Sequence, residues 1–565
     1  MRKATEQSRP NEGGVSVTHI ERQSPRPAMP ERFDEEFDII VAGAGGVGLA
    51  AALFARWLGN NVLVLEKADA PGGTTQKAAF WYWVPNNEPM RALGIEDRRE
   101  DCLRYMARLS RPEQYDPDHP RFGMSEWEYE AYEAIYDNAS VATELLANKG
   151  ALEYRHCAAV PDYWAEIPED KAPTGRVLLP KDACETMSDG GKVAIRTMLA
   201  AAARDGIGVR TAHRVQRVVQ DARGRVIGVV ATRADGGHIA LKARKGVIFA
   251  TGGFTHNVEM RKNHLSAPVL GGCAARTNEG DFVHIGAAVG AELRNMNYAW
   301  MCPIVLEKAL QQDPGLIGTF SPSGDSMIYV DKNGRRVTNE KLAYNESAQA
   351  FFQWDPAKCE YPNLVLIAVW DRRSQEHSAS DEYGRFIVPP GADAAHVISG
   401  RTLEELAAAI GARMAQYSSV IGGMRTSEDF AANLRATIAR FNGFAREGKD
   451  LDFRRGERPV ELLFNGPTAA TPSAPNPTMY PISDEGPYYA ALLTGGNLDT
   501  KGGPATNARG QVVDRMGEPI PGLYGAGNCV ASASARAYWA GGATLGPFLA
   551  FAYLAANAAH REPVN

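Results

Sequence analysis

The sequence predicts an α/β protein with a Rossmann-like fold near its N-terminus, and three observations support this fold class. Residues 37–42 (FDIIVA) form a short apolar run of strand composition. A glycine-rich turn at 43–48 (GAGGVG) and an Ala-rich, helix-forming segment at 49–58 follow at once. A second apolar run at 61–66 ends in an acid. Strand, glycine turn, helix and strand in this order are typical of a dinucleotide-binding unit.

The residues of this unit have distinct expected roles. Gly43, Gly45, Gly46 and Gly48 allow a tight turn, close approach of the backbone to a pyrophosphate, and close packing of helix on strand. The N-terminus of the helix faces the phosphates. Glu66 stands 18 residues after Gly48, where a carboxylate can accept a ribose hydroxyl. We therefore expect a bound dinucleotide.

The segment after the second strand favours FAD over NAD. Gly72, Gly73, Thr74 and Thr75 can lay backbone N–H groups and hydroxyls along a flavin diphosphate arm. The runs 245–254 and 522–528 each read as a strand that ends in a glycine turn, and 541–547 opens the last helix, whose free N–H groups can face the flavin pyrimidine. The further residues expected to contact FAD are Lys67, Thr251, Gly252, Gly253, Asn278, Gly527, Asn528, Thr544 and Leu545.

Composition narrows the class of protein. A chain of 565 residues predicts two domains, or one with a large insertion. The net charge of −6 offers no basic face, so we expect no nucleic-acid partner. Seven scattered cysteines without a CxxC pair predict no metal site, no disulfide framework and a reducing, cytoplasmic location. The polar segment 1–32 predicts a disordered tail rather than a secretory signal, and the apolar segment 543–559 a buried helix rather than a transmembrane segment.

Four further motifs carry a family resemblance: 84–87 (VPNN), 335–340 (RRVTNE), 500–503 (TKGG) and 537–547 (AYWAGGATLGP). With the glycine motifs, they resemble the flavoprotein superfamily of fumarate reductase and 3-ketosteroid 1-dehydrogenase, including its cyclohexanone dehydrogenase-like members, over nearly the whole chain after the tail. The resemblance implies a Rossmann-like FAD-binding domain with an inserted α+β catalytic (capping) domain. We place the FAD-binding domain at 33–299 and 484–565 and the catalytic domain at 300–483, with helices near 402–418 and 427–447.

The resemblance also implies a reaction, the removal of two hydrogens beside a ketone, with the hydride passing to the flavin. Tyr538 and the backbone N–H of Gly542 match the pair that polarises the carbonyl. Tyr344 matches the base that takes the α-proton, and Tyr163 the tyrosine that assists it. A phenol with a pKa of about 10 is a poor base near neutrality, so a pair of hydroxyls is more reasonable than one.

The segment 76–83 departs from the steroid-acting pattern, because bulky rings stand where those enzymes have small residues. If these rings line the pocket, they narrow it to one ring, and the expected substrate is a small cyclic ketone, cyclohexanone, converted to 2-cyclohexen-1-one. The alternative is that they pack into the core and a 3-ketosteroid remains the substrate. The residues expected to line the pocket are Phe80, Trp81, Trp83 and Trp164.

Two other functions remain open. An ene-reductase of the fumarate-reductase kind needs a cationic site for a substrate carboxylate. A flavin-binding sensor or electron carrier needs no tyrosine constellation. The external electron acceptor, a quinone or a carrier protein, is not specified by the sequence. The arginines available for a carboxylate site are Arg276, Arg335, Arg336 and Arg536.

Overall fold

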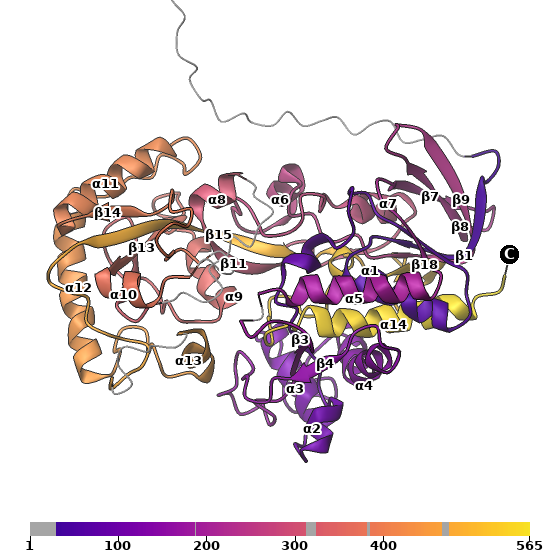
Figure 1. Cartoon of the computed structure of the whole chain (residues 1–565), viewed down its shortest axis with the longest axis horizontal. Coiled ribbons are helices and arrows are strands. Elements are labelled where there is room, and N and C mark those ends of the chain that lie inside the picture. The colour runs from indigo at the N-terminus through magenta and orange to yellow at the C-terminus, as the bar shows by residue number, and fades with distance from the viewer. Residues whose placement is uncertain (1–29, 187, 312–323, 381–384, 466–473, 565) are drawn as a thin grey trace, which may run out of the picture.

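The computed structural model describes residues 30–186, 188–311, 324–380, 385–465 and 474–564. The predicted tail 1–32 lies outside the described residues except for its last three. Two sheets with their helices lie side by side along the long axis of the molecule (Figure 1).

The first sheet has the parallel order β18-β9-β1-β2-β6, with the β7–β8 hairpin on β9 and β17 antiparallel to β18. Ile40 of β1 stands beside Leu63 on one side and Val247 on the other, so the buried apolar runs of the sequence form its centre. This confirms the predicted α/β class. The strands are β1 (Glu35–Ala42), β2 (Val62–Leu65), β6 (Gly208–Arg210), β7 (Arg214–Gln220), β8 (Val226–Thr232), β9 (His238–Phe249), β17 (Gln511–Val513) and β18 (Pro519–Gly525).

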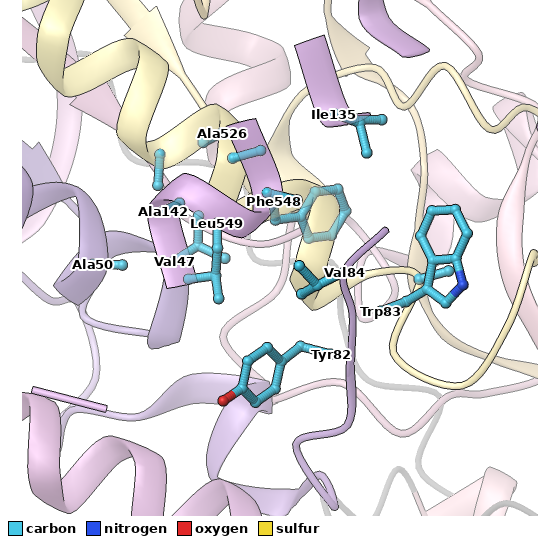
Figure 2. Packing of buried hydrophobic residues seen from close by; sticks show 14 of the residues in the cluster. Val47, Ala50, Tyr82, Trp83, Val84, Ile135, Ala142, Ala526, Phe548 and Leu549 are labelled. Carbon is cyan, nitrogen blue, oxygen red and sulfur yellow. The ribbon is translucent and has the colours of Figure 1, made fainter. Parts of the chain in front are cut away.

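Three helices lie side by side next to this sheet (Figure 1). They are α1 (Gly46–Trp57), α5 (Gly190–Arg204) and α14 (Leu545–Arg561). The helices pack together through apolar side chains: Val47 and Ala50 of α1 lie in one buried cluster with Phe548 and Leu549 of α14 (Figure 2). The predicted buried helix at 543–559 is therefore α14, which brings the C-terminal segment back to the first sheet.

A smaller layer covers the other side of α14. It consists of a three-stranded antiparallel sheet and three helices, and it supplies Tyr163 to the site described below. Its elements are β3 (Tyr82–Trp83), α2 (Glu88–Ala92), α3 (Arg99–Ser110), α4 (Glu126–Asn148), β4 (Tyr154–His156) and β5 (Val177–Pro180).

The second sheet is antiparallel and has the order β11-β15-β13-β12, with β14 also on β15. A separate buried cluster packs β13 against α11 (Leu403–Gln416) and α12 (Phe430–Glu447). These two helices match the helices predicted near 402–418 and 427–447. The elements of this part are β11 (Ala299–Val305), α8 (Leu306–Gln311), β12 (Met327–Val330), α9 (Tyr344–Ser347), β13 (Val365–Asp371), α10 (Arg372–His377), β14 (Ile398–Gly400), α11 (Leu403–Gln416), α12 (Phe430–Glu447), α13 (Pro459–Asn465) and β15 (Tyr488–Thr500).

One strand corrects a predicted boundary. The sequence analysis returned the chain to the FAD-binding domain at 484, but β15 pairs with β11, β13 and β14 over its whole length. Residues 488–500 therefore belong to the second sheet, because this apolar strand is buried by its neighbours there. The connecting elements are η1 (Gly73–Lys77), α6 (Val258–His264), α7 (Asp281–Ala288), β10 (Leu293–Arg294), η2 (Ala348–Phe352), β16 (Gly503–Pro504) and η4 (Gly527–Cys529).

Within the described residues, we find no helix that is both long and apolar enough to cross a membrane.

Candidate active site

A cavity of about 410 Å³ runs from the glycine turn of the first sheet to the edge of the second. Most of the residues predicted to contact a cofactor line it. Gly48, Gly72 and Gly253 were also predicted to contact the cofactor but are not among the lining residues that the structure describes. The predicted residues in the lining are Gly43, Gly45, Gly46, Glu66, Lys67, Gly73, Thr74, Thr75, Thr251, Gly252, Asn278, Gly527, Asn528, Thr544 and Leu545.

The glycine turn between β1 and α1 leaves no room for side chains. Gly43 has a φ of +104°, and a Cβ there would lie 2.3 Å from the carbonyl oxygen of Ala250. A Cβ on Gly48 would lie 1.9 Å from the carbonyl oxygen of Gly43, which explains why helix and turn pack so closely. At Gly45, by contrast, the nearest atom to a Cβ is 3.7 Å away. The turn therefore presents bare backbone and the N-terminus of α1 to the cavity, as a pyrophosphate requires.

Glu66 is held in place at the end of β2. Its two carboxylate oxygens accept hydrogen bonds from the backbone N–H groups of Ala44 and Ala68, each at 2.8 Å. Each oxygen keeps a second acceptor site, which suits a ribose hydroxyl. The neighbouring Lys67 also lines the cavity, but its ammonium group is paired with Glu279 and Asp281 at 2.9 and 3.1 Å.

Asp499 of β15 joins several predicted cofactor residues, and the sequence analysis did not identify it. One of its oxygens accepts from Gly253 N at 2.9 Å, Asn278 Nδ2 at 2.6 Å and Asn528 Nδ2 at 3.2 Å. Burial raises the pKa of this carboxyl group. Its place directly before the 500–503 motif was the available signal. Asp499, from the second sheet, thus holds Gly253, Asn278 and Asn528 together at the cavity.

Three tyrosines from distant parts of the chain meet at the other end of the cavity. The hydroxyl of Tyr163 donates to the hydroxyl oxygen of Tyr344 at 2.8 Å. The ring of Tyr538 lies 5.4 Å from that of Tyr163 and 5.2 Å from that of Tyr344, between centroids. Burial raises the pKa of all three phenols, that of Tyr538 to about 12. The structure thus brings together the three tyrosines that the sequence analysis selected.

Gly542 lies at the beginning of α14, on the same side of the cavity. Its carbonyl oxygen accepts from the N–H groups of Trp83 and Gly546, at 3.0 and 3.1 Å. Its own N–H makes no hydrogen bond to any described residue. A φ of +84° and the backbone of Trp81, 2.4 Å from where a Cβ would stand, exclude other side chains here. The N–H of Gly542 is therefore a free donor at the cavity wall.

A buried charge network fixes the segment that carries Tyr163. The guanidinium group of Arg176 bonds Asp97, Asp162 and Asp170 at 2.8, 2.5 and 3.0 Å, and none of these four side chains is exposed. Asp162 directly precedes Tyr163, whose N–H donates to the carbonyl oxygen of Trp539 at 3.0 Å. Tyr163 is thereby tied both to the network and to the segment that holds Tyr538.

The aromatic segment after the flavin arm divides between cavity and core. Trp81 lines the cavity, with its ring against Gly541, and Phe80 lines it beside Gly46 at the cofactor end. Trp83 does not line it, because its indole N–H donates to Asp162 at 3.0 Å and the ring is buried in the core (Figure 2). Trp164 also lies outside the lining that the described residues form, with the guanidinium group of Arg458 over its ring. The expectation for Trp83 and Trp164 was wrong.

Among the lining residues that the sequence analysis did not predict are His213, Trp300 and Arg385. Trp300 donates from its indole N–H to Asn528 at 2.9 Å and packs edge-on against Tyr538, with ring centroids 4.8 Å apart. No short motif marks any of the three, since each reaches the cavity only through the tertiary fold.

Comparison with known proteins supports the interpretation of this cavity as an FAD site. A family model described as the FAD binding domain matches residues 38–545. The 4-oxocyclohexanecarboxylate 2-dehydrogenase of Sinomonas cyclohexanicum is 29% identical over 92% of this chain and 92% of its own length. The 3-oxosteroid 1-dehydrogenase of Mycolicibacterium smegmatis is 28% identical, over 92% of this chain and 97% of its own.

A solved structure shows the same fold. The 3-ketosteroid delta1-dehydrogenase from Sterolibacterium denitrificans, in complex with 1,4-androstadiene-3,17-dione, superposes with a TM-score of 0.79 and 24% identity over 93% of this chain and 99% of that one. The glycine turn, Glu66 and the amide donors around the cavity fit FAD, and the family model covers nearly the whole described chain. The chain therefore belongs to the FAD binding domain family and is an FAD-dependent oxidoreductase.

Proposed function

We propose that this protein is a dehydrogenase that introduces an α,β double bond into a cyclic ketone, with cyclohexanone to 2-cyclohexen-1-one as the reaction that we favour. The observation that carries the proposal is the cluster of Tyr163, Tyr344 and Tyr538 at one end of the FAD-binding cavity. The names of the two relatives, an oxocyclohexanecarboxylate dehydrogenase and an oxosteroid dehydrogenase, support the same type of reaction.

Each residue has a separate task in this proposal. The Tyr538 hydroxyl and the free N–H of Gly542 donate to the ketone oxygen and stabilise the negative charge that develops there. Tyr344, as its phenolate, accepts the α-proton and becomes neutral, and the Tyr163 hydroxyl, 2.8 Å away, stabilises that phenolate beforehand by donating a hydrogen bond to it. Bound FAD supplies the acceptor for the β-hydride. An external electron acceptor, a quinone or a carrier protein, completes the turnover, and we place the enzyme in the cytoplasm.

The size of the substrate follows from Trp81. Its indole occupies the space beside Gly541, three residues after Tyr538, and so narrows the cavity next to the carbonyl-binding donors. This supports a single-ring ketone rather than a steroid, although only one of the two tryptophans predicted in this segment faces the cavity.

A second candidate substrate is a cyclic ketone that carries a carboxylate. None of Arg276, Arg335, Arg336 and Arg536 belongs to the described lining of the cavity, and Arg336 is paired with Glu340 and Asp450. Arg385 does line the cavity, and like Tyr344 it comes from the segment 300–483. A guanidinium group suits a carboxylate, so the presence of Arg385 in the lining makes an oxo acid the second candidate.

The test is anaerobic mixing of the oxidised holoenzyme with cyclohexanone, 4-oxocyclohexanecarboxylate or a 3-ketosteroid, followed by flavin absorbance and product analysis. Bleaching by a single-ring ketone with formation of its enone supports the proposal, and Tyr538→Phe is expected to slow it on the order of 100-fold. Bleaching by the steroid alone would exclude the narrow pocket. Reoxidation of reduced enzyme by an enoate, without bleaching by any ketone, would favour the ene-reductase.

Arg385→Gln separates the two single-ring substrates. If the carboxylate binds Arg385, the variant raises KM for 4-oxocyclohexanecarboxylate by roughly tenfold or more and leaves the kinetics with cyclohexanone unchanged. Arg335→Gln is the matched control, because Arg335 is exposed and outside the described lining. Equal changes for both ketones would argue against a carboxylate site.

A further inference from the structure

Lys501 is a buried amine for which the proposed reaction has no use. It follows β15 in the 500–503 motif, and its side chain is completely buried. Its amine forms no ion pair within 4.0 Å among the residues that the structure describes, and its hydrogen bonds go to backbone carbonyl groups. A buried amine needs such hydrogen-bond partners to replace water.

Its partners are two carbonyl oxygens in the segment that leads to Tyr538. The amine of Lys501 donates to Ala535 O at 2.9 Å and to Ala537 O at 2.5 Å. The backbone adds a third link, because the N–H of Ser532 donates to the carbonyl oxygen of Lys501 at 2.9 Å. Lys501 thus holds both ends of a three-residue segment whose next residue is Tyr538.

This segment has a conformation that needs support. Ala535 has a φ of +45°, in the left-handed region that residues with a Cβ rarely adopt. Such backbone strain persists only where surrounding contacts impose it. The two hydrogen bonds from Lys501 fix the carbonyl group of Ala535 itself and the one just before Tyr538.

Lys501 also contacts the ring that packs on Tyr538. Its amine lies 3.8 Å from the centroid of Trp300. The edge-on contact between Trp300 and Tyr538 has a centroid distance of 4.8 Å. One side chain therefore restrains Tyr538 in two ways, through the backbone before it and through the ring beside it.

We propose that Lys501 is a positioning residue for Tyr538. This proposal rests on the function proposed above. Lys501 keeps the Tyr538 hydroxyl at the position where it and the N–H of Gly542 converge on the ketone oxygen. Without these restraints the 535–537 segment relaxes, and the hydroxyl moves away from the position where charge develops. The loss falls mainly on kcat, because this hydrogen bond is strongest in the transition state.

The test is a double-mutant cycle in the holoenzyme with the ketone that bleaches the flavin fastest. Lys501→Met keeps most of the side-chain volume and removes the donors, and we expect kcat to fall on the order of 10-fold to 100-fold with a smaller change in KM. In a Tyr538→Phe background the same substitution should lower kcat by about twofold or less, because it acts through the Tyr538 hydroxyl, which that background lacks. Lys501→Arg, which keeps hydrogen-bond donors at this position, should retain more of kcat than Lys501→Met.

Hydrogen exchange of the peptide 533–542 gives a readout that does not depend on turnover. We expect faster exchange in Lys501→Met than in the parent enzyme and little change in Lys501→Arg. Lys245→Met is the matched control, because Lys245 also donates to a backbone carbonyl, that of His560, at 2.9 Å and far from the tyrosines. If Lys501→Met does not fold with FAD bound, Lys501→Gln takes its place in the same cycle.

The outcomes are distinguishable. An equal loss of kcat in both backgrounds, or unchanged exchange in 533–542, would overturn the role of Lys501 while leaving the function intact. If Tyr538→Phe keeps full turnover, the proposed function fails, and the exchange data alone then decide whether Lys501 positions the segment.

Discussion

At the scale of single residues, the Tyr163–Tyr344 pair makes the proposed reaction depend on pH. A phenol accepts a proton only when it is ionised, and burial raises the pKa of both residues above the usual value of about 10. The reactive fraction therefore grows as pH rises, and kcat/KM should increase from pH 7 to pH 9.5. Tyr538, with a pKa of about 12, stays protonated as a donor over this range.

The hydrogen bond between Tyr163 and Tyr344 means that they titrate as a pair, so one apparent pKa belongs to both. Tyr344→Phe should remove the rise together with most of the activity. A rate that falls between pH 7 and pH 9 would be incompatible with a phenolic base. The measurement is a steady-state pH profile with the flavin content checked at each pH.

Trp81 and Trp83 make a matched pair for the pocket. Trp81→Ala should widen the cavity beside Gly541 and raise kcat/KM for a 3-ketosteroid relative to cyclohexanone. Trp83→Ala should leave this ratio unchanged and destabilise the fold by about 3–5 kcal/mol, because its ring is completely buried. Activity ratios and thermal unfolding of both variants decide the matter. An unchanged ratio in Trp81→Ala would mean that this ring does not limit substrate size.

At the scale of elements, the β1–α1 turn depends on the absence of side chains. Gly48→Ala would place a Cβ 1.9 Å from the carbonyl oxygen of Gly43, so helix and turn must separate and FAD binding should be lost. Gly443→Ala is the control, because no atom lies within 4 Å of a Cβ there. In the middle of α12 it should stabilise the protein by about 0.5–1 kcal/mol. Retained flavin in Gly48→Ala would show that the turn tolerates widening.

Elements with a strong local pattern were predictable, and their partners were not. The glycine turn, α11, α12 and α14 follow from spacing and periodicity within a few residues. Which of Trp81 and Trp83 faces the cavity depends instead on tertiary contacts: Trp83 belongs to β3, which pairs with β5, whereas Trp81 precedes that strand and packs against Gly541. The same holds for Asp499, whose contacts exist only because β15 extends from the second sheet to the cofactor residues of the first.

At the scale of the whole molecule, the second sheet has a core of its own with α11 and α12, but its strand β11 also joins the core of the first part through Trp300, Cys302 and Ile304. The core around β13, α11 and α12 is distinct from the core around α1 and α14. The cavity, however, is lined by Gly43 and Glu66 from one part and by Trp300 and Tyr344 from the other. Parts of a protein with different cores can unfold in different transitions, and a ligand that binds both parts couples their unfolding.

We therefore expect two thermal transitions for the apoprotein that approach each other as FAD is added. FAD present at 1,000 times its Kd stabilises the parts that bind it by about 4 kcal/mol, and the part with the glycine turn should gain most. Calorimetry with hydrogen exchange of β13 as the marker for the second core would follow both. A single apoprotein transition would mean that β15, which lies in the second sheet and carries Asp499 to the first, already couples the two cores without the ligand.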